Sequence, residues 1–586
     1  MILILGGTTE GRKAVEVMEE AGSPFFYSTK TGEQDVALHH GTAVSGAMDY
    51  GQMCSFCREH GVRLLVDAAH PFASQLHDTV ARVSADLSIP SIRYERIYPP
   101  RDLSLTWIDG YDQMPPLKGV LLATTGVQSI ARLRTFESDE LGIIYRILNR
   151  DSSLRLAREQ GARLDQLCFY ESGEDERELL RRIRPDAVLM KESGTTGGFV
   201  EKCRAAKELG IQVIVIRRPQ LSSVFHVVDG VHGLRRAVEQ LLPEFFPLHS
   251  GLTTGTCATA AAVAHASWLL NGEKPGEVPV VLPNGETIYV DVAYGDGYAF
   301  TLKESGDDPD ITNGMEIRAQ VEPSCTFEVR GGEGVGVITL PGFDYPPGSP
   351  AINKGPRRML EENLSRFGEP LRVTVSVPGG AETARKTFNP RLGIEGGISI
   401  IGVSGIIMPY SEEAFLESIR KCMEIAKKSG AERVVINSGA KSERFVRGLY
   451  PDLPSQAFVE YGNYIGETLK MAADLDVAKV TLGIMMGKAV KLAAGHLDTH
   501  SRHTTMDRTF IAGMLREAGC GEEVVVQAAQ MNLAKELWTI VPPESLQDFC
   551  QVVLRHCRQH CMPLLPQGEL TILLISEEGK FFEEKA

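Results

Sequence analysis

Short apolar runs and amphipathic stretches alternate from the start of the chain. Residues 2–5 are continuously apolar and predict a buried strand, and residues 10–21 carry apolar side chains at helical spacing. A second apolar strand is predicted at residues 24–27. A strand, a helix and a strand in this order form a βαβ unit, so the pattern predicts a parallel sheet.

The same alternation continues through the first half of the chain. Further strands are predicted at residues 64–67, 91–94, 120–123 and 187–191. Ligands of parallel sheets bind beyond the carboxyl ends of the strands, so the loops there are candidate binding loops. We predict an α/β first half of two doubly wound, Rossmann-like units, with a cleft between their loop edges where a flat substrate could bind.

The pattern changes after a short linker with two prolines at residues 242–247. An alanine-rich helix is predicted to about residue 270, and strands then dominate to about residue 377. The later predicted elements alternate again: helix 412–429, strand 433–437, helix 464–475 and strand 479–484. We therefore predict two regions, 1–245 and 249–586, the second an α+β unit (249–400) followed by an α/β unit (401–586).

Composition and charge narrow the classes of function. A chain of 586 residues exceeds one hydrophobic core, and a formal net charge of -15 disfavours binding to nucleic acid or to an anionic membrane surface. No apolar run reaches the roughly 18 residues of a membrane span, and the opening run is too short for a signal peptide. Eleven cysteines, an odd number, indicate reduced thiols. We expect a cytoplasmic protein with small-molecule partners.

The turn after the first predicted strand reads Gly6-Gly7-Thr8-Thr9-Glu10-Gly11-Arg12. It keeps the outer glycines of the dinucleotide fingerprint G-x-G-x-x-G, but Thr8 replaces the middle glycine. The turn opens a helix whose N–H groups and threonine hydroxyls can hold a phosphate. The alternative is a tight turn that contacts no ligand.

The end of the second predicted strand selects between dinucleotides. An NAD site usually has an acid there, whereas this chain has hydroxyls and a lysine, which suit the 2′-phosphate of NADPH. The predicted cofactor-binding residues of the first half are Gly6, Gly7, Thr8, Thr9, Gly11, Arg12, Ser28, Thr29 and Lys30.

His70 lies in the predicted loop Asp67-Ala68-Ala69-His70-Pro71-Phe72. Within the cleft it could donate a proton to the substrate. The alternative, a loop histidine that caps the next helix, is equally compatible with the sequence.

Four segments of the first half resemble the precorrin-6A reductase family, including its cobalt-precorrin-6A members: residues 6–12, 67–73, 191–194 and 211–219. The resemblance covers about residues 1–245 and implies hydride transfer from NADPH to a corrin-ring precursor. It also implies substrate contacts at Lys191, Ser193 and Gly194. The chain departs from the family at Tyr170-Glu171-Ser172-Gly173, where the family has Gly-Pro-Phe, and at Glu192, where it has a smaller polar or amide residue.

The second half opens with Thr253-Thr254-Gly255-Thr256 before the alanine-rich helix. These residues could bind the carboxylate or phosphate of a cofactor, or simply form a threonine-capped helix. Gly332-Glu333-Gly334-Val335-Gly336 precedes a strand rather than a helix, so we predict a hairpin turn there. Asp307 and Asp308 could serve as bases, or could belong to an acidic surface turn.

Possible metal ligands are few and poorly spaced. Cys54 and Cys57 form one CxxC with no second pair, and His496, Asp498, His500 and His503 fit no familiar zinc spacing. Cys550, Cys557 and Cys561 have helical spacing and indicate one face of a terminal helix. We predict no resident metal.

Six motifs in order across residues 250–505 resemble the cobalt-precorrin-5B carbon-1 methyltransferase family: residues 253–260, 306–310, 332–336, 350–353, 389–399 and 499–501. The resemblance implies S-adenosylmethionine as methyl donor, although the usual glycine loop of methyltransferases is absent. Arg391 is then a candidate partner for the acetate and propionate groups of the macrocycle, as are Arg357 and Arg358 unless they are surface charges. Asp307, Asp308 or His500 would supply any base.

Together the two resemblances imply a bifunctional enzyme of cobalamin biosynthesis. It would methylate cobalt-precorrin-5B at carbon 1 to give cobalt-precorrin-6A, and then reduce that product to cobalt-precorrin-6B. The alternatives are a reductase of another substrate fused to an unrelated methyltransferase, and a tetrapyrrole-binding carrier.

Overall fold

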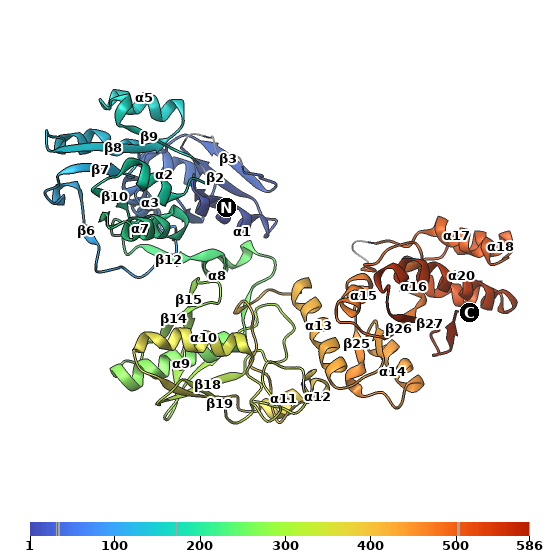
Figure 1. Ribbon diagram of the computed structural model, residues 1–586. Helices are drawn as coiled ribbons and strands as arrows, with labels where there is room; N and C mark the ends of the chain where they lie inside the picture. Colours follow the sequence, from blue (N-terminus) through green and yellow to red (C-terminus); the bar gives the residue numbers. More distant parts are fainter. Residues whose placement is uncertain (31, 33–35, 172, 501–503, 585–586) are drawn as a thin grey trace. The chain divides into compact units, whose positions relative to one another are not determined.

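The computed structural model describes residues 1–30, 32, 36–171, 173–500 and 504–584, and the chain forms two compact units (Figure 1). The first unit is Met1–Ser250 with Pro279–Val290, and the second is Gly251–Val278 with Asp291–Ala586. Ser172, Ser501 and His503, which were quoted above, lie outside the described residues.

The first unit contains two six-stranded parallel sheets. The first sheet has the order β12-β5-β4-β1-β2-β3. Its strands are β1 (Ile2–Leu5), β2 (Phe25–Thr29), β3 (Gly41–Ser45), β4 (Leu64–Asp67), β5 (Ser91–Glu95) and β12 (Phe225–Asp229). The chain moves outward from β1 in both directions, so the order reverses between β1 and β4, and the loops after these two strands lie together at the carboxyl edge.

Helices cover both faces of this first sheet. Apolar side chains of α1 (Thr9–Glu19) and α8 (Gly230–Leu241) pack in one core on one face. Those of α2 (Tyr50–Glu59) and α3 (Ser74–Leu87) pack in a second core on the other face. Cys54 and Cys57 are buried in this second core as part of the face of α2.

The second sheet of the first unit has the order β6-β11-β10-β7-β8-β9. Its strands are β6 (Thr106–Ile108), β7 (Gly119–Ala123), β8 (Leu141–Leu148), β9 (Leu167–Tyr170), β10 (Ala187–Lys191) and β11 (Gln212–Ile216). The chain passes between the two sheets twice, through residues 96–105 and 217–224. The predicted doubly wound α/β arrangement is therefore confirmed, while the return of β12 to the first sheet was not predicted.

Helix α8 is capped by a residue far ahead in the chain. The side chain of Asp229, at the N-terminal boundary of the helix, makes no capping hydrogen bond. Instead, the Glu286 carboxylate accepts hydrogen bonds from the N–H groups of Val231 and His232, both at 3.0 Å. Gly230 leaves room for this carboxylate, because a Cβ there would lie 2.0 Å from Glu286 Cγ. The hairpin between β14 (Glu277–Val281) and β15 (Thr287–Asp291) thus completes the first unit.

The segment after α8 is packed rather than extended. Phe245 and Phe246 are buried in the core of the first sheet, and Ser250 donates to the Glu239 carboxylate on α8 through its N–H (2.9 Å) and its hydroxyl (2.6 Å). The segment predicted as a linker therefore contributes to the core of the first unit.

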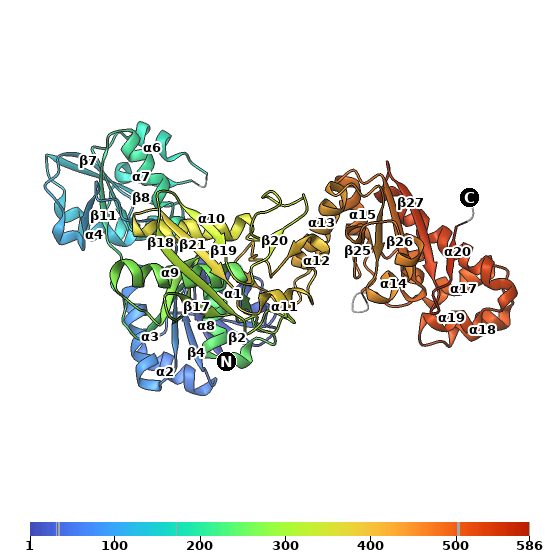
Figure 2. The same ribbon diagram turned by 90° about the horizontal axis from the view of Figure 1, so that it is seen from below.

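The first part of the second unit is built around α9 (Thr254–Asn271), whose residues 254–266 are all buried. Small alanine side chains allow this helix to pack closely against the sheet β16-β17-β18-β21-β19 and against α10 (Lys354–Leu364), as Figures 1 and 2 show. The sheet strands are β16 (Ala293–Tyr294), β17 (Ala299–Leu302), β18 (Glu316–Pro323), β19 (Glu328–Gly331) and β21 (Leu371–Ser376). This is the predicted α+β region.

The turn predicted at residues 332–336 lies between β19 and β20 (Val337–Ile338), and no helix follows it. Its glycines are needed for close backbone packing, since a Cβ on Gly334 would lie 1.9 Å from the Val377 carbonyl oxygen. The predicted turn without a following helix is present, but it is not a hairpin turn, because β19 pairs with β21 and β20 pairs with β22 (Ile394–Glu395) in a separate sheet.

The last part of the second unit is an α/β sheet of order β25-β24-β26-β27-β28, in which only β28 is antiparallel. Its strands are β24 (Val434–Asn437), β25 (Phe458–Glu460), β26 (Lys479–Met485), β27 (Glu569–Ile575) and β28 (Phe581–Glu583). Its helices include α13 (Glu412–Lys428), α14 (Ala440–Leu449), α15 (Ile465–Asp474), α16 (Met486–Ala493) and α20 (Pro543–Cys561). Cys550, Cys557 and Cys561 are buried on one face of α20, as predicted.

Within the described ranges, no helix is both long enough and apolar enough to cross a lipid bilayer.

We predict that Glu286→Ala speeds hydrogen exchange of the first-turn amides of α8. The substitution leaves two buried N–H groups without an acceptor, which should cost about 1–2 kcal/mol of local stability. Hydrogen exchange followed by mass spectrometry of peptides covering residues 226–241 measures the effect. Glu277→Ala, at an exposed position at the start of the same hairpin, is the control and should exchange like the wild type. Equal protection of α8 in both variants would contradict the capping role.

Candidate functional site

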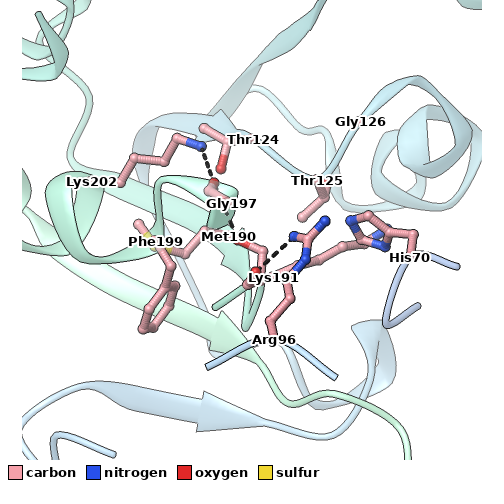
Figure 3. A pocket seen from close by; sticks show the side chains of 11 residues that line it. His70, Arg96, Thr124, Thr125, Gly126, Met190, Lys191, Gly197, Phe199 and Lys202 are labelled. Carbon is pink, nitrogen blue, oxygen red and sulfur yellow. Dashed lines mark hydrogen bonds between the residues drawn. The ribbon is translucent and has the colours of Figure 1, made fainter. Parts of the chain in front are cut away.

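The loops at the carboxyl ends of the two sheets of the first unit enclose a cavity of about 230 Å³ (Figure 3). Loops after β4, β5, β7 and β10 contribute to it, together with the start of α7 (Phe199–Glu208). Its lining residues are His70, Arg96, Thr124, Thr125, Gly126, Met190, Lys191, Ser193, Gly197, Phe199 and Lys202. The predicted cleft between two loop edges is therefore present.

The cavity is cationic although the chain is acidic. Arg96, Lys191 and Lys202 contribute three basic side chains, and burial lowers the pKa of both lysines. The Lys191 ammonium lies 5.0 Å from the centre of the Phe72 ring. Met190 and Phe199 add apolar surface. Such a lining suits a ligand that combines an apolar ring with carboxylates or phosphates.

Arg96 ties the two sheets together at the cavity. Its Nε lies 3.0 Å from the Glu10 carboxylate at the start of α1, and its Nη1 donates to the Ser193 carbonyl after β10 (2.7 Å). The Thr196 hydroxyl donates to the other oxygen of the Glu10 carboxylate (2.6 Å). The Arg96 and Glu10 side chains are only 8% and 6% exposed. Breaking the pair would leave an uncompensated buried charge, so it fixes the spacing of the two loop edges.

His70 lies in the loop after β4, at the cavity wall (Figure 3). Water reaches the imidazole ring through the cavity. Burial of the ring by the surrounding protein nevertheless disfavours its charged form and, together with the charges of Arg96 and Lys191, lowers the pKa of His70 to about 4. The Phe72 N–H donates to His70 Nδ1 (3.2 Å), which assigns the hydrogen of the neutral ring to Nε2. His70 is therefore a neutral hydrogen-bond donor near pH 7.

A buried ionic network holds the loop that carries His70. The fully buried Asp67 carboxylate binds His77 Nδ1 (2.5 Å) and Arg93 Nη1 (2.8 Å), and it accepts from the Ala69 N–H (3.1 Å). Arg93 also donates to the carbonyls of Asp67 and Ala69. Burial would raise the pKa of Asp67, but the hydrogen bond of His77 and the charge of Arg93 outweigh it and lower the pKa.

The predicted phosphate turn lies where β1 meets α1. The Thr8 hydroxyl accepts from the Gly11 N–H (3.0 Å) and donates to the Ala68 carbonyl (2.7 Å), which joins this turn to the His70 loop. Gly6 and Gly11 are required for close packing, since a Cβ on Gly6 would lie 2.2 Å from the Tyr27 ring, and one on Gly11 would lie 2.9 Å from the Gly6 Cα. Gly7 has φ of +96°, its N–H donates to the Tyr27 hydroxyl (3.2 Å), and no atom lies within 4 Å of its Cβ position. The turn can therefore accept a ligand group at Gly7.

The other predicted dinucleotide residues lie at the same edge. Arg12 donates to the Thr9 hydroxyl (3.3 Å) on the exposed side of α1. Ser28 is buried and accepts from the Gly6 N–H through its carbonyl (2.8 Å), while Thr29 ends β2 and Lys30 is exposed beyond it. Arg12 and Lys30 thus offer positive charge beside the strand end where a 2′-phosphate would bind.

Two of the predicted substrate residues act through their backbone. The Ser193 carbonyl accepts from Arg96, and Gly194 has φ of +73°, with a Cβ position 2.8 Å from Arg96 Cβ. Lys191, Ser193 and the neighbouring Gly197 line the cavity.

Glu192 joins the two segments that connect the sheets. Its carboxylate accepts two hydrogen bonds from Arg101, both at 2.9 Å, and one from the Arg218 N–H at 3.0 Å. Arg101 lies in the first connecting segment and Arg218 in the second. This residue, at which the chain departs from the reductase family pattern, therefore fixes both crossings at the end of β10.

In the second unit, residues 253–256 form the first turn of α9 and its cap. Thr253 accepts from the Thr256 N–H (3.2 Å), the Thr256 hydroxyl donates to the Gly405 carbonyl (2.6 Å), and the Thr254 hydroxyl accepts from the Ile401 N–H (2.8 Å). The Gly255 N–H donates to the Ile401 carbonyl (2.9 Å). The segment is buried, and these contacts are those of a capped helix; a cofactor contact here stays a prediction.

The candidate bases of the second unit come from different parts of it. Asp307 is exposed, and burial raises the pKa of Asp308 in the turn after β17. His500 follows α16, and its N–H donates to Asp498 (2.9 Å). Nearby, the buried Lys303 pairs with Asp310 (2.6 Å), an ion pair that the sequence did not reveal. Within the described part of the chain, no group of three or more His, Cys, Asp or Glu side chains could hold a metal.

The candidate arginines already have protein partners. Arg391 pairs with the buried Glu443 at the start of α14 (2.7 Å). Arg357 donates to the Ile352 carbonyl (2.9 Å) and stacks on Tyr345, and Arg358 is an exposed partner of Glu362.

Several residues at the cavity were not predicted: Arg96, Thr196, Lys202, Thr125 and Phe199. No local motif marks Arg96 or Lys202 as special. Glu10 belongs to the glycine turn at residues 6–12. A carboxylate in the first turn of a helix that is predicted to bind phosphate was the one feature of the sequence that indicated a basic partner nearby.

Comparisons with known proteins place both halves. A family model described as "Precorrin-6x reductase CbiJ/CobK" matches residues 1–241. One described as "CbiD" matches residues 243–409, and "CbiD, C-terminal domain" matches residues 498–585. The "Cobalt-precorrin-5B C(1)-methyltransferase" of Prosthecochloris aestuarii is 43% identical over 346 residues, which is 56% of this chain and 94% of that protein. The protein of the same name from Thermus thermophilus is 40% identical over 305 residues, 51% of this chain and 83% of that protein.

Two solved structures are also similar in part. The cobalamin biosynthesis protein cbiD from Archaeoglobus fulgidus is 31% identical, with a TM-score of 0.26, and the match covers 47% of this chain and 85% of that one. A structure titled CobK precorrin-6A reductase is 19% identical, with a TM-score of 0.35, and the match covers 41% of this chain and 97% of that one.

We predict that Asp67→Asn destabilises the first unit by about 3 kcal/mol or more at neutral pH, because Arg93 and His77 lose a buried anionic partner. Chemical denaturation measures the loss of unfolding free energy, and hydrogen exchange of the amides in β4 and β5 shows where the loss occurs. Because the folded pKa of Asp67 lies below its unfolded value of about 3.9, its contribution is present above that pH and is lost as the pH falls through the folded pKa. The difference in unfolding free energy between the variant and the wild type should therefore become smaller below about pH 4. Asp78→Asn, exposed on α3, should change little; equal stability of the two variants would contradict the network's role.

Proposed function

The chain belongs to the cobalt-precorrin-5B C(1)-methyltransferase family and carries a precorrin-6x reductase region before it, and from this we propose that its two reactions use S-adenosylmethionine and NADPH. The protein is a bifunctional enzyme of corrin biosynthesis. It methylates cobalt-precorrin-5B at carbon 1 and reduces the product, cobalt-precorrin-6A, to cobalt-precorrin-6B. The two reactions are consecutive, which accounts for their fusion.

We assign the reductase to residues 1–245 and the methyltransferase to residues 249–586. Because residues 242–250 join the two regions covalently, the product of the first reaction stays at a raised effective concentration near the second enzyme. All eleven cysteines lie among the described residues and none of them forms a disulfide there, which supports a reducing, cytoplasmic location.

The observation that supports the reductase proposal most is the cationic cavity between the two loop edges. The macrocycle carries acetate and propionate groups, and Lys191 and Lys202 offer their charges where the apolar ring would pack on Met190 and Phe199. The Gly7 turn and the charges of Arg12 and Lys30 lie at the same edge of the first sheet, and we propose that they bind the pyrophosphate and 2′-phosphate of NADPH.

NADPH supplies a hydride, and the protein must position the ring and provide for a proton. We propose that the neutral His70 donates a hydrogen bond from Nε2 to the substrate ring and orients it. The Asp67 network and the Thr8 hydroxyl hold the His70 loop in place, so the donor is preorganised.

For methyl transfer we retain Asp307, Asp308 and His500 as candidate bases. The Arg391–Glu443 pair supports a role for Arg391 near the carboxyl end of β24, since the pair lies at the start of α14, which follows that strand.

Incubation of the purified protein with cobalt-precorrin-5B, S-adenosylmethionine and NADPH without oxygen tests the proposal. Mass spectrometry should show a gain of one methylene and then of two hydrogens, and omission of NADPH should stop the reaction after the methylene. Binding without a change of mass would indicate a carrier instead. Methylation alone with NADPH present would indicate a reductase for another substrate.

We predict that His70→Gln lowers the rate of reduction by about 10²-fold and leaves methylation unchanged, since one positioned donor contributes about that factor. With a pKa of about 4, wild-type His70 is neutral above pH 5, so its titration adds no inflection to the reduction rate between pH 6 and 8. Single-turnover rates across that range measure both effects. His226→Gln, exposed on β12, is the control. Reduction by His70→Gln at the wild-type rate would remove His70 from the site.

A further inference from the structure

The last sheet of the second unit has its own reversal of strand order. From β24 the chain passes through α14 to β25 on one side, and from β25 through α15 to β26 on the other side. The order of the parallel strands therefore reverses between β24 and β26. In open α/β sheets the carboxyl edge at such a point is where ligands bind.

Glu460 is the last residue of β25 and lies opposite Asn437, the last residue of β24. Its carboxylate makes no hydrogen bond and no ion pair with any residue that the structure describes. Burial, followed by the charge of Glu443, raises the pKa of Glu460. A partly buried carboxylate without a partner is costly for the protein alone.

The neighbouring Glu443 differs from Glu460 in this respect. Glu443 is buried and pairs with both Arg391 and Arg447, each at 2.7 Å. It already has two cationic partners, whereas Glu460, on the next strand, has acceptor capacity left for a ligand.

The turn between β24 and α14 packs against the Glu460 carboxylate. Gly439 has φ of +144°, and a Cβ there would lie 3.3 Å from Glu460 Oε1. The Asn437 side chain holds this turn, because its Oδ1 accepts from the Gly439 N–H (3.1 Å) and its Nδ2 donates to the Val459 carbonyl (3.3 Å). The glycine and the hydrogen-bonded turn thus give the Glu460 carboxylate room at the carboxyl edge.

The residue after Glu460 is buried in the core of the last sheet. The hydroxyl of Tyr461, directly after Glu460, is buried without a hydrogen-bond partner in the described part of the chain. Burial raises the pKa of Tyr461, and the nearby Ser438 hydroxyl, in the turn after β24, opposes that effect. The Tyr461 side chain therefore belongs to the core, where Cys557 and Cys561 of α20 also act on it.

Lys488, in the first turn of α16, completes the edge on the β26 side. Its ammonium donates to the Gly462 carbonyl, and burial lowers its pKa to about 8. Its charge acts on Glu460 without forming an ion pair within 4.0 Å. The edge therefore carries one carboxylate acceptor and one cation, which suits a ligand with hydroxyl groups and a carboxylate.

In a βαβ unit that binds a nucleoside, an acid at the end of the second strand accepts hydrogen bonds from the ribose hydroxyls. Glu460 holds this position relative to β24 and α14. We propose that Glu460 binds the ribose hydroxyls of S-adenosylmethionine at the β24–β25 edge, an inference that rests on the methyltransferase function proposed above. The α9 start is the less suitable place, because its threonine hydroxyls and the Gly255 N–H are already bonded within the protein.

Isothermal titration of the full chain with S-adenosylhomocysteine, the demethylated product, tests this. Glu460→Gln keeps the size of the side chain and removes its charge, so affinity should fall about 10-fold or more. Glu467→Gln, on the exposed surface of α15 in the same sheet domain, is the matched control and should bind like the wild type. NADPH affinity should be the same in all three proteins.

A ligand change gives a test that does not depend on the variant's folding. The wild type should bind the 2′-deoxy analogue of S-adenosylhomocysteine about 10-fold more weakly than the parent compound. Glu460→Gln should discriminate between the two compounds far less, because the two changes remove the same hydrogen bond.

Undiminished affinity of Glu460→Gln, or equal discrimination against the deoxy analogue by both proteins, would overturn the Glu460 assignment. In that case methylation by the wild type would leave the proposed function standing. A wild type that neither binds S-adenosylhomocysteine nor methylates cobalt-precorrin-5B would overturn both.

Discussion

The pairing of Arg96 with Glu10 determines the geometry on which the first unit's site depends. Arg96 leaves the first sheet at the end of β5, reaches Glu10 on α1, and donates to the backbone of the second sheet at Ser193. Both side chains are almost fully buried, so neither could be solvated if the loop edges separated. The cavity wall that carries His70 and the wall that carries Lys191 are therefore held together by this buried ion pair and by its hydrogen bonds to Ser193 and Thr196.

The local charges at the cavity run against those of the whole chain. A net charge of -15 would repel an acidic macrocycle at long range, yet the cavity presents three basic side chains. The acids close to it, Glu10 and Glu192, are taken up by Arg96 and Arg101. Because these acids pair with arginines of the protein, Lys191 and Lys202 remain available to a ligand. Salt screens distant charges more than near ones, so the charges at the cavity affect binding more than the net charge of the chain does.

In the second unit, glycine and threonine motifs serve packing more than ligand contact. Gly334 allows the backbone to approach Val377, and Thr254 and Thr256 satisfy backbone groups of residues 401 and 405. The Glu460 carboxylate, which no described residue pairs with, lies instead at the carboxyl edge of the last sheet. A motif that identifies a family therefore need not be the place where its ligand binds, since close packing also requires particular residue types.

The sequence by itself determined the strands and helices, the parallel sheets and the relationship to two enzyme families, because apolar spacing and turn residues act over a few positions. It predicted His70 and the Gly7 turn at one edge, since the carboxyl ends of parallel strands meet there, and a cleft between that edge and the loops of the second α/β unit. Only the tertiary structure decided that Thr196 binds Glu10, 186 positions away, that Glu286 caps α8 from 55 positions away, and that β12 returns to the first sheet. Hydrogen bonds and ion pairs between such distant residues depend on how the sheets pack, and no local spacing in the chain encodes them.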